Sequence, residues 1–178
     1  MITNFDELLL AARTRSGMKV AVAAAQDKEV LEAVAMAVAH DMGQFVLVGD
    51  EPKVRSLAAD AGLDLAGVEI VHEPDPAAAA RLAVARVSSR DAGILMKGLV
   101  PTADFLRAVL DKEIGLRTGR LLSHAAVFKS PAYDRFFYLT DGAMNIAPTL
   151  EQKVQIIQNT VELAHRLGNA EPKVACVA

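Results

Sequence analysis

The fold is decided by residues 17–50, which read G-M-K-V-A-V-A-A-A-Q-D-K-E-V-L-E-A-V-A-M-A-V-A-H-D-M-G-Q-F-V-L-V-G-D. A short apolar run rich in valine and alanine, Met18 to Ala24, predicts a buried β-strand. Apolar side chains then recur at helical spacing from Asp27 to Met42, and Asp27 is a residue type that caps helices. A second apolar run, Phe45 to Val48, predicts the next strand. The stretch therefore predicts a strand–helix–strand unit.

The same alternation of strand and helix runs through most of the chain. The ranges that show it are a helix at Asn4 to Arg15, a helix at Glu51 to Ala61, a strand at Val68 to Val71, a helix at Pro76 to Ser88, a strand at Ala92 to Met96 and a helix at Pro101 to Lys112. Short loops between them imply right-handed crossovers. We therefore predict a three-layer α/β/α fold with a mostly parallel sheet.

The pattern changes after Lys112. Two apolar runs, Leu121 to Phe128 and Phe136 to Leu139, predict an antiparallel strand pair near one edge of the sheet. Thr149 to Leu167 is the longest helical pattern, and Pro172 to Ala178 resembles a strand that has barely begun. We therefore expect residues 1–147 to form a first α/β domain. Residues 148–178 are expected to form the long helix and first strand of a truncated second domain.

Composition excludes several classes of protein. The chain has 178 residues, of which 52% are hydrophobic, so it can bury a core. The formal net charge of −3 argues against a nucleic-acid-binding protein, which is usually basic. The single cysteine, Cys176, excludes an intrachain disulfide and disfavours a cysteine-based zinc site. That cysteine usage is typical of the reducing cytoplasm. The amino terminus shows no signal peptide, and no apolar run is long enough to cross a membrane.

A first candidate site lies where a predicted buried strand ends in Lys97 and Gly98. Ligands of open α/β sheets bind beyond the carboxyl ends of strands. Gly98 lacks a Cβ, so a ligand or a tight turn can come close to its backbone. Thr102 is placed to cap the next helix, whose free N–H groups favour an anion. The alternative is a surface lysine beside an ordinary glycine turn.

A second candidate is the loop G-L-R-T-G-R-L-L-S-H, residues 115–124. No aspartate or glutamate occurs between residues 114 and 133, so Arg117 and Arg120 have no acidic neighbour in sequence. Arginine side chains bind phosphate through two parallel hydrogen bonds. His124 is the one histidine near this loop. The alternative is a solvated loop, or arginines paired with carboxylates distant in sequence.

A third candidate is T-D-G-A-M-N-I-A-P, residues 140–148, where an apolar strand ends. Asp141 and Asn145 can orient a ligand there, or they can simply stabilise a turn. The sequence contains no glycine-rich dinucleotide or P-loop motif and no serine nucleophile elbow. The four histidines show no metal-ligand spacing, so no metal site is predicted.

Taken in order, these segments resemble the phosphate acetyl/butyryltransferase family, with the closest likeness to phosphate butyryltransferases. The motifs that carry the likeness are M-K-G at 96–98, T-x-x-F-L-x-A-V-L from Thr102, G-L-R-T-G-R-L-L-S-H at 115–124, P-A-Y at 131–133, T-D-G-A-M-N-I-A-P at 140–148 and E-P-K-V-A at 171–175. The resemblance implies a two-domain fold similar to that of isocitrate and isopropylmalate dehydrogenases. It also implies a homo-oligomer.

The implied reaction converts acyl-CoA and inorganic phosphate to acyl phosphate and CoA by direct attack. The resemblance implies no cofactor, since coenzyme A is a substrate, and neither nucleic acid nor membrane as a partner. On this basis Lys97, Gly98 and Thr102 are assigned to the phosphate or acyl-phosphate end. Arg117 and Arg120 are assigned to phosphate or to the phosphates of CoA. His124, Asp141 and Asn145 are expected to shape the pocket.

Family members extend for about another hundred residues, a typical domain's worth. The resemblance places further polar site residues there, including the acidic residue proposed as a base, so the catalytic residue is not assigned. Two other interpretations remain: a non-catalytic lobe that binds phosphate or CoA, and a dehydrogenase related by fold. The second needs a cluster of metal-binding aspartates, and Asp141 has no acidic neighbour in sequence.

Overall fold

The computed structural model describes residues 1–14 and 17–177, and two compact units make it up. Residues Ala12–Thr118 form one, here called the parallel-sheet unit. Met1–Ala11 and Gly119–Ala178 together form the other, here called the ribbon–helix unit. The boundary expected between residues 147 and 148 does not coincide with this division, because it falls inside the ribbon–helix unit.

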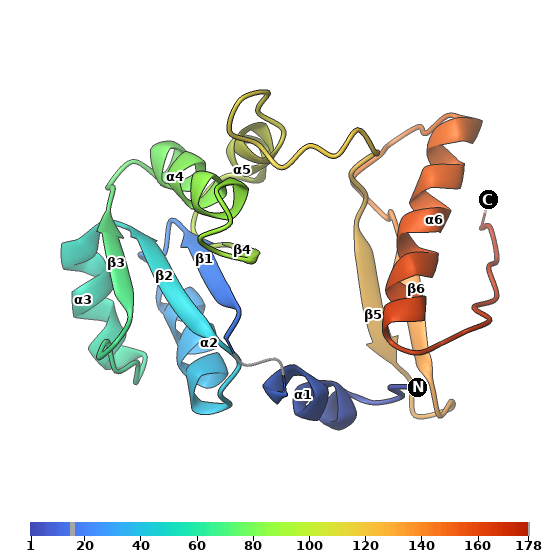
Figure 1. Ribbon diagram of the computed structural model, residues 1–178, viewed down its shortest axis with the longest axis horizontal. Coiled ribbons are helices and arrows are strands. Elements are labelled where there is room, and N and C mark those ends of the chain that lie inside the picture. Colours follow the sequence, from blue (N-terminus) through green and yellow to red (C-terminus); the bar gives the residue numbers. More distant parts are fainter. Residues whose placement is uncertain (15–16, 178) are drawn as a thin grey trace. The chain divides into compact units, whose positions relative to one another are not determined.

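The parallel-sheet unit contains a four-stranded sheet with strand order β3-β2-β1-β4, all parallel (Figure 1). Its strands are β1 (Lys19–Ala23), β2 (Gln44–Gly49), β3 (Glu69–His72) and β4 (Ile94–Lys97). Its helices are α2 (Lys28–Ala39), α3 (Glu51–Asp60), α4 (Pro76–Ser88) and α5 (Thr102–Val109). The α/β fold with a mostly parallel sheet, and the order of these elements, agree with the prediction from sequence.

Strand β1 shows why helices cover both faces of this sheet. Val20 and Val22 point into a core formed with α2 and α3, whereas Ala21 and Ala23 point into a second core formed with α4 and α5. Side chains of a strand alternate between faces, so a strand that is apolar at every position needs cover on both sides. The valine- and alanine-rich composition therefore produces three layers.

Aspartates fix the start of three helices in this unit. Asp27, Asp50 and Asp75 each accept a hydrogen bond from the backbone N–H three residues later, at 3.1, 3.3 and 2.7 Å. This contact satisfies one of the N–H groups that a helix leaves unpaired at its first turn. The expected cap at Asp27 is confirmed.

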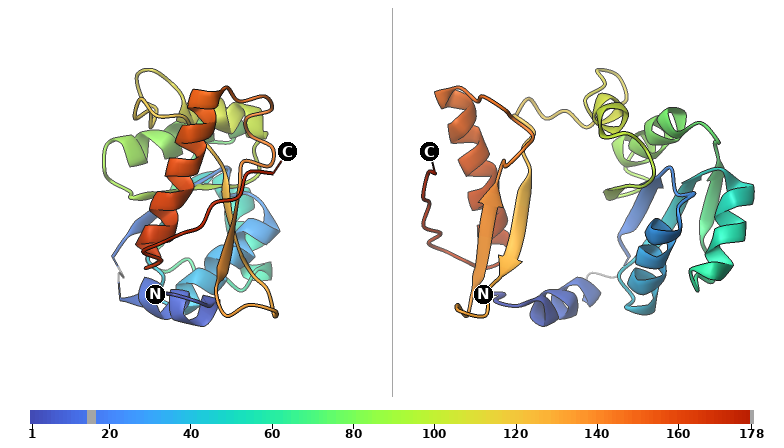
Figure 2. Two further views of the ribbon diagram at one scale, coloured as in Figure 1. Left: turned by 90° about the vertical axis from the view of Figure 1, so that its right-hand side faces the viewer. Right: turned by 180° about the vertical axis from the view of Figure 1, so that it is seen from behind.

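The ribbon–helix unit contains β5 (Ala125–Lys129), β6 (Phe136–Thr140) and α6 (Leu150–Arg166), and α6 runs beside the strand pair in both views of Figure 2. The first helix, α1 (Phe5–Arg13), contributes residues to both units. The strands pair antiparallel, as predicted, but they form a two-stranded sheet of their own. The expected position at an edge of the parallel sheet was therefore wrong. Periodicity identifies strands but does not specify the sheet that they join.

The two faces of the β5–β6 ribbon differ in burial. On one face Phe136 is 5% exposed, and its ring lies 5.1 Å from that of Phe5. On the opposite face Phe128 and Phe137, which pair across the ribbon, are 49% and 40% exposed. Leu139 on that face is also exposed. We call this exposed set, Phe128, Phe137 and Leu139, the open ribbon face.

Two predictions near the ends of the pattern have different outcomes. The strand expected from Pro172 was wrong, because residues 172–177 form none. An extended segment becomes a strand only by hydrogen bonding to a neighbouring strand, and no strand among the described residues pairs with this segment. The first helix was predicted to end at Arg15, which lies outside the described residues. Within them, α1 ends at Arg13. None of the helices that the structure describes combines the length and apolar character needed to span a membrane.

Candidate functional site

The carboxyl end of β4 is built against the carboxyl end of β1. The Gly98 N–H donates to the Ala23 carbonyl oxygen and the Leu99 N–H to the Ala24 carbonyl oxygen, both at 2.8 Å. A Cβ on Gly98 would lie 2.4 Å from each of those oxygens, so only glycine fits. The backbone at the carboxyl end of β1 is therefore the group that comes close to Gly98. Beside it Lys97 is exposed, and its Nζ donates to the Gly98 carbonyl oxygen at 3.3 Å.

Thr102 does not cap α5, contrary to the expectation from sequence. The N-cap residue is Pro101, which makes no side-chain capping bond, and Thr102 is the first residue inside the helix. A capping side chain must precede the first helical residue to reach back to the free N–H groups. Those groups at the start of α5 therefore keep their capacity to bind an anion, and Thr102 is exposed beside them.

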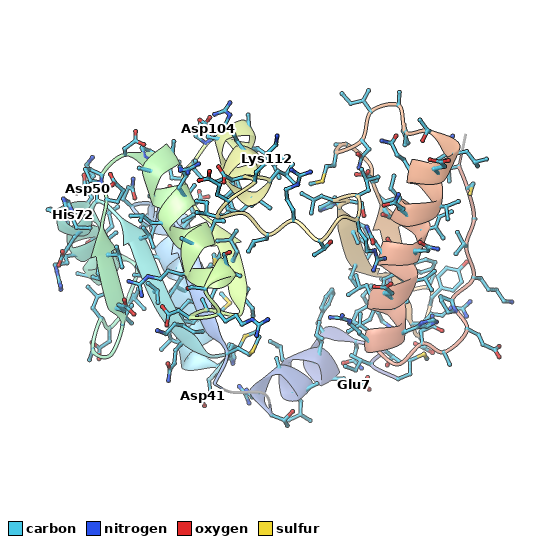
Figure 3. The ribbon with its side chains drawn as sticks, turned by 45° about the horizontal axis from the view of Figure 1, so that its top comes forward. Glu7, Asp41, Asp50, His72, Asp104 and Lys112 are labelled. Carbon is cyan, nitrogen blue, oxygen red and sulfur yellow. The ribbon has the colours of Figure 1, made fainter. Side chains whose placement is uncertain are left out.

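Arg117 lies in the same unit, after α5, and its side chain is exposed. It makes no hydrogen bond or ion pair within residues 1–14 and 17–177. Two other arginines around α5 are paired: Arg107 contacts Asp104, and Arg81 donates to Asp111 at 2.8 Å (Asp104 is labelled in Figure 3). The hydrogen bond from Arg81, with backbone bonds from Ile114 and Glu113, lowers the pKa of Asp111 to about 2.

Arg120 lies in the ribbon–helix unit, and its guanidinium is held by α6. Its Nη1 donates to both carboxylate oxygens of Glu162, at 2.9 and 3.1 Å, and its Nη2 donates to Asn159 Oδ1 at 2.8 Å. The carboxylate that compensates Arg120 is thus distant in sequence, one of the alternatives left open above. A guanidinium carries five N–H donors, so at least two have no protein acceptor in the described part of the chain.

His124, Asp141 and Asn145 come together at one end of the ribbon. The His124 carbonyl oxygen accepts hydrogen bonds from the Asp141 N–H at 3.0 Å and from Thr140 Oγ1 at 2.9 Å. Asn145 Nδ2 donates to an Asp141 carboxylate oxygen and to the Leu122 carbonyl oxygen, the latter at 3.1 Å. Asp141 has a φ of +50°, a conformation that aspartate tolerates better than most residues. These contacts order the loop, and the His124 side chain itself is exposed.

The predicted site residues thus divide between the two units, and hydrogen bonds link Lys97 with Gly98 and His124 with Asp141 and Asn145. Lys97, Gly98, Thr102 and Arg117 belong to the parallel-sheet unit, and Arg120, His124, Asp141 and Asn145 belong to the ribbon–helix unit. Sequence reasoning missed three polar residues of α6 that hold residues 119–124: Gln155, Asn159 and Glu162. The available signal was their spacing of four and three residues, which places them on one helix face.

An open groove of about 730 Å³ lies beside these residues in the ribbon–helix unit. Its lining residues include Gly119, Arg120, Gln155, Glu162 and His165. In this wall the Arg120 guanidinium has spare N–H donors for an anion, and the Glu162 carboxylate beside it offsets part of its charge. No group of three histidine, cysteine, aspartate or glutamate side chains among the described residues is arranged to hold a metal ion.

The other strand ends of the parallel sheet carry a separate polar group. His72, which ends β3, accepts a hydrogen bond on Nδ1 from the Glu51 N–H at 3.1 Å, and Asp50 lies nearby (Figure 3). Lys53 lowers the pKa of Asp50 through a hydrogen bond. These contacts complete the first turn of α3, which explains them without a ligand.

Comparison with known proteins identifies the family. The sequence profile described as "Phosphate acetyl/butaryl transferase" matches residues 4–78 and 75–178. The chain is 47% identical to the phosphate butyryltransferase of Clostridium acetobutylicum over 175 residues, and 49% identical to that of Clostridium beijerinckii. Each alignment covers 98% of this chain and 58% of the relative.

A solved structure agrees with the sequence comparison. The branched-chain phosphotransacylase of Enterococcus faecalis superposes with a TM-score of 0.67 at 32% identity, over 85% of this chain and 52% of that one. The chain therefore spans a little more than half the length of the curated relatives that it matches. Since the profile and these relatives together account for nearly every residue, the chain belongs to the phosphate acetyl/butaryl transferase family.

Proposed function

We propose that this chain is the first part of an acyltransferase that moves an acetyl or butyryl group between coenzyme A and inorganic phosphate. The observation that supports this most is its 47–49% identity to two phosphate butyryltransferases across 98% of its length. We further propose the homo-oligomeric state and the isocitrate dehydrogenase-like architecture that the family resemblance implies, a cytoplasmic location, and no requirement for a cofactor.

The proposed reaction is a direct displacement. A phosphate oxygen attacks the thioester carbonyl carbon, the carbon–sulfur bond breaks, and the CoA thiolate leaves and takes up a proton. Negative charge develops on the carbonyl oxygen while two anions are held together. Cations and free N–H groups that stabilise this charge in the transition state lower the barrier.

The polar groups described above supply such donors. We assign Lys97, Gly98 and the start of α5 at Thr102 to the phosphate or acyl-phosphate end. Arg117, exposed and unpaired within the described residues, and Arg120, with spare donors on its guanidinium, are assigned to phosphate or to the phosphates of CoA. His124, Asp141 and Asn145 order the loop beside Arg120. The general base is proposed to lie in the part of the family fold that this chain does not span.

The test is phosphate-dependent release of CoA thiol from butyryl-CoA and acetyl-CoA. It compares this chain with a fusion to the remaining part of the Clostridium acetobutylicum relative. Turnover by the fusion, lost without phosphate, is the expected result. In that fusion Arg120→Ala and Lys97→Ala are expected to lower kcat/KM by about 10–100-fold, the effect of losing one charge-assisted hydrogen bond.

The matched control is Arg55→Ala, which removes an exposed arginine paired with Glu51 on α3 and is expected to leave turnover unchanged. A second candidate is a lobe that binds phosphate or CoA without turnover, on donors such as the spare N–H groups of Arg120. Ligand binding by the chain with an inactive fusion would favour this second candidate. If the chain binds no ligand and the fusion shows no turnover, both candidates are contradicted.

A further inference from the structure

The backbone of residues 120–123 is held by side chains of α6. The Leu121 N–H donates to Gln155 Oε1 at 2.8 Å, so a side chain of α6 holds the backbone amide of this loop residue. Asn159 Nδ2 donates to the Leu121 carbonyl oxygen and to Ser123 Oγ, both at 2.9 Å. Asn159 thus holds the loop at two points, 36 and 38 residues away in sequence.

Asn159 also fixes the side chain of Arg120. Its Oδ1 accepts a hydrogen bond from Arg120 Nη2 at 2.8 Å, while the Glu162 carboxylate accepts from Arg120 Nη1. An asparagine amide has two N–H donors and one carbonyl oxygen, and all three are engaged here. Rotating the amide by 180° would place its N–H groups against the guanidinium and its oxygen against a carbonyl, so the network admits one orientation.

We propose that Asn159 is a positioning residue for the reaction: it sets the path of residues 120–123 and, through it, the direction of the Arg120 guanidinium. This inference rests on the proposed function. Arg120 lines the open groove beside α6, and its spare N–H donors are available to an anion there. A free arginine side chain loses rotamer entropy when it is ordered, and prior ordering spares an incoming ligand that cost.

The first test uses trypsin, which cleaves after arginine, on the native chain. Cleavage of the 120–121 bond is measured by mass spectrometry relative to the 117–118 bond in the same molecule. In Asn159→Ala the ratio is expected to rise about fivefold or more, because the Leu121 carbonyl and Ser123 hydroxyl lose their partner. An unchanged ratio would overturn the proposal.

Asn159→Asp separates loop positioning from the pairing of Arg120. Aspartate keeps an acceptor for Arg120 and for a Ser123 hydroxyl turned to donate, but it has no donor for the Leu121 carbonyl oxygen, so the cleavage ratio is expected to rise above that of the wild type. A wild-type ratio in Asn159→Asp would overturn the proposal. Val154→Ala, which trims an exposed α6 side chain, is the control and is expected to leave the ratio unchanged.

The second test is calorimetric titration of the full chain with inorganic phosphate. Both Asn159 variants are expected to bind phosphate about tenfold more weakly, at a thermal midpoint within a few degrees of the wild type. Equal phosphate affinity in wild type and Asn159→Ala would overturn the positioning role. A wild-type chain that binds no phosphate would count against the proposed function, while the trypsin ratio would still decide whether Asn159 sets the loop.

Discussion

The Ala23 carbonyl oxygen accepts a hydrogen bond from the Gly98 N–H at 2.8 Å, and the same oxygen lies 2.4 Å from where a Cβ on Gly98 would stand. The hydrogen bond and the lack of a side chain therefore depend on each other. Because both partners are backbone atoms at the ends of paired strands β1 and β4, neither can move aside without disturbing the sheet.

We predict from this contact that Gly98→Ala destabilises the chain by about 2 kcal/mol, as overpacking in a core does. Urea unfolding measures the change. The control is Gly142→Ala, because a Cβ there would meet nothing within 4 Å. That variant is expected to stay within about 0.5 kcal/mol of the wild type. Equal stability of Gly98→Ala and wild type would contradict the contact.

A second prediction concerns pH. The hydrogen bond from Arg81, together with backbone hydrogen bonds from Ile114 and Glu113, lowers the pKa of Asp111 from 3.8 to about 2. A carboxyl whose pKa is lower in the folded state contributes stability above its unfolded pKa and loses it as pH falls through the folded value. The stability difference between wild type and Asp111→Asn should therefore be full at pH 6 and shrink from pH 3.8 toward 2.

Thermal unfolding at a series of pH values measures that difference. The matched control is Asp134→Asn, since Asp134 is fully exposed and its carboxylate comes no closer than 4.0 Å to the Lys129 ammonium. Its difference from wild type is expected to be near zero at every pH. A difference for Asp111→Asn that did not depend on pH would argue against the ion pair as its cause.

The third prediction uses neighbouring phenylalanines on opposite faces of β6. Phe136→Ala should cost about 3 kcal/mol, because it empties a buried site against Phe5. Phe137→Ala should cost less than about 1 kcal/mol, because its ring is 40% exposed and contacts Tyr133 at one edge. Binding of a hydrophobic dye should fall in Phe137→Ala. Similar losses in both variants would show that the open ribbon face is covered in solution.

The fourth prediction concerns a closed group of four charges at the amino ends of β1, β3 and β4. Lys19 pairs with Asp91 at 3.0 Å and with Glu69 at 3.4 Å, and Arg86 pairs with the same two carboxylates at 2.7 and 2.9 Å. Asp91→Asn should lower the thermal midpoint by a few degrees, and 1 M salt should reduce the difference. Glu32→Gln, which breaks the isolated pair with Lys28, should change nothing measurable.

The sequence predicted local structure well because that structure depends on neighbours. The valine and alanine runs at β1 and β2, the Asp27 cap and the helix at Pro76–Ser88 all follow from side chains within a few positions. The pairing of β5 with β6 was also predicted, since a short connection favours an antiparallel pair. What failed depends on distant partners: the sheet to which that pair belongs, and the strand expected at 172–178.

The candidate site divides in the same way. The residue types near Arg120 could be selected from their charge, but the partners Glu162 and Asn159 lie 42 and 39 residues away. No local pattern reports such a contact. The capping role of Thr102 failed by a single position, because the N-cap residue of α5 is Pro101 and Thr102 is the first residue inside the helix.

The ribbon–helix unit is discontinuous in sequence, and this affects the order in which the chain folds during synthesis. The Ile2 N–H donates to the Leu167 carbonyl oxygen at 2.8 Å, so this contact forms only after α6 has been made. The parallel-sheet unit is one continuous stretch and can fold as soon as Thr118 has emerged. Residues 1–11 therefore reach their partners in the ribbon–helix unit only after α6 has been made.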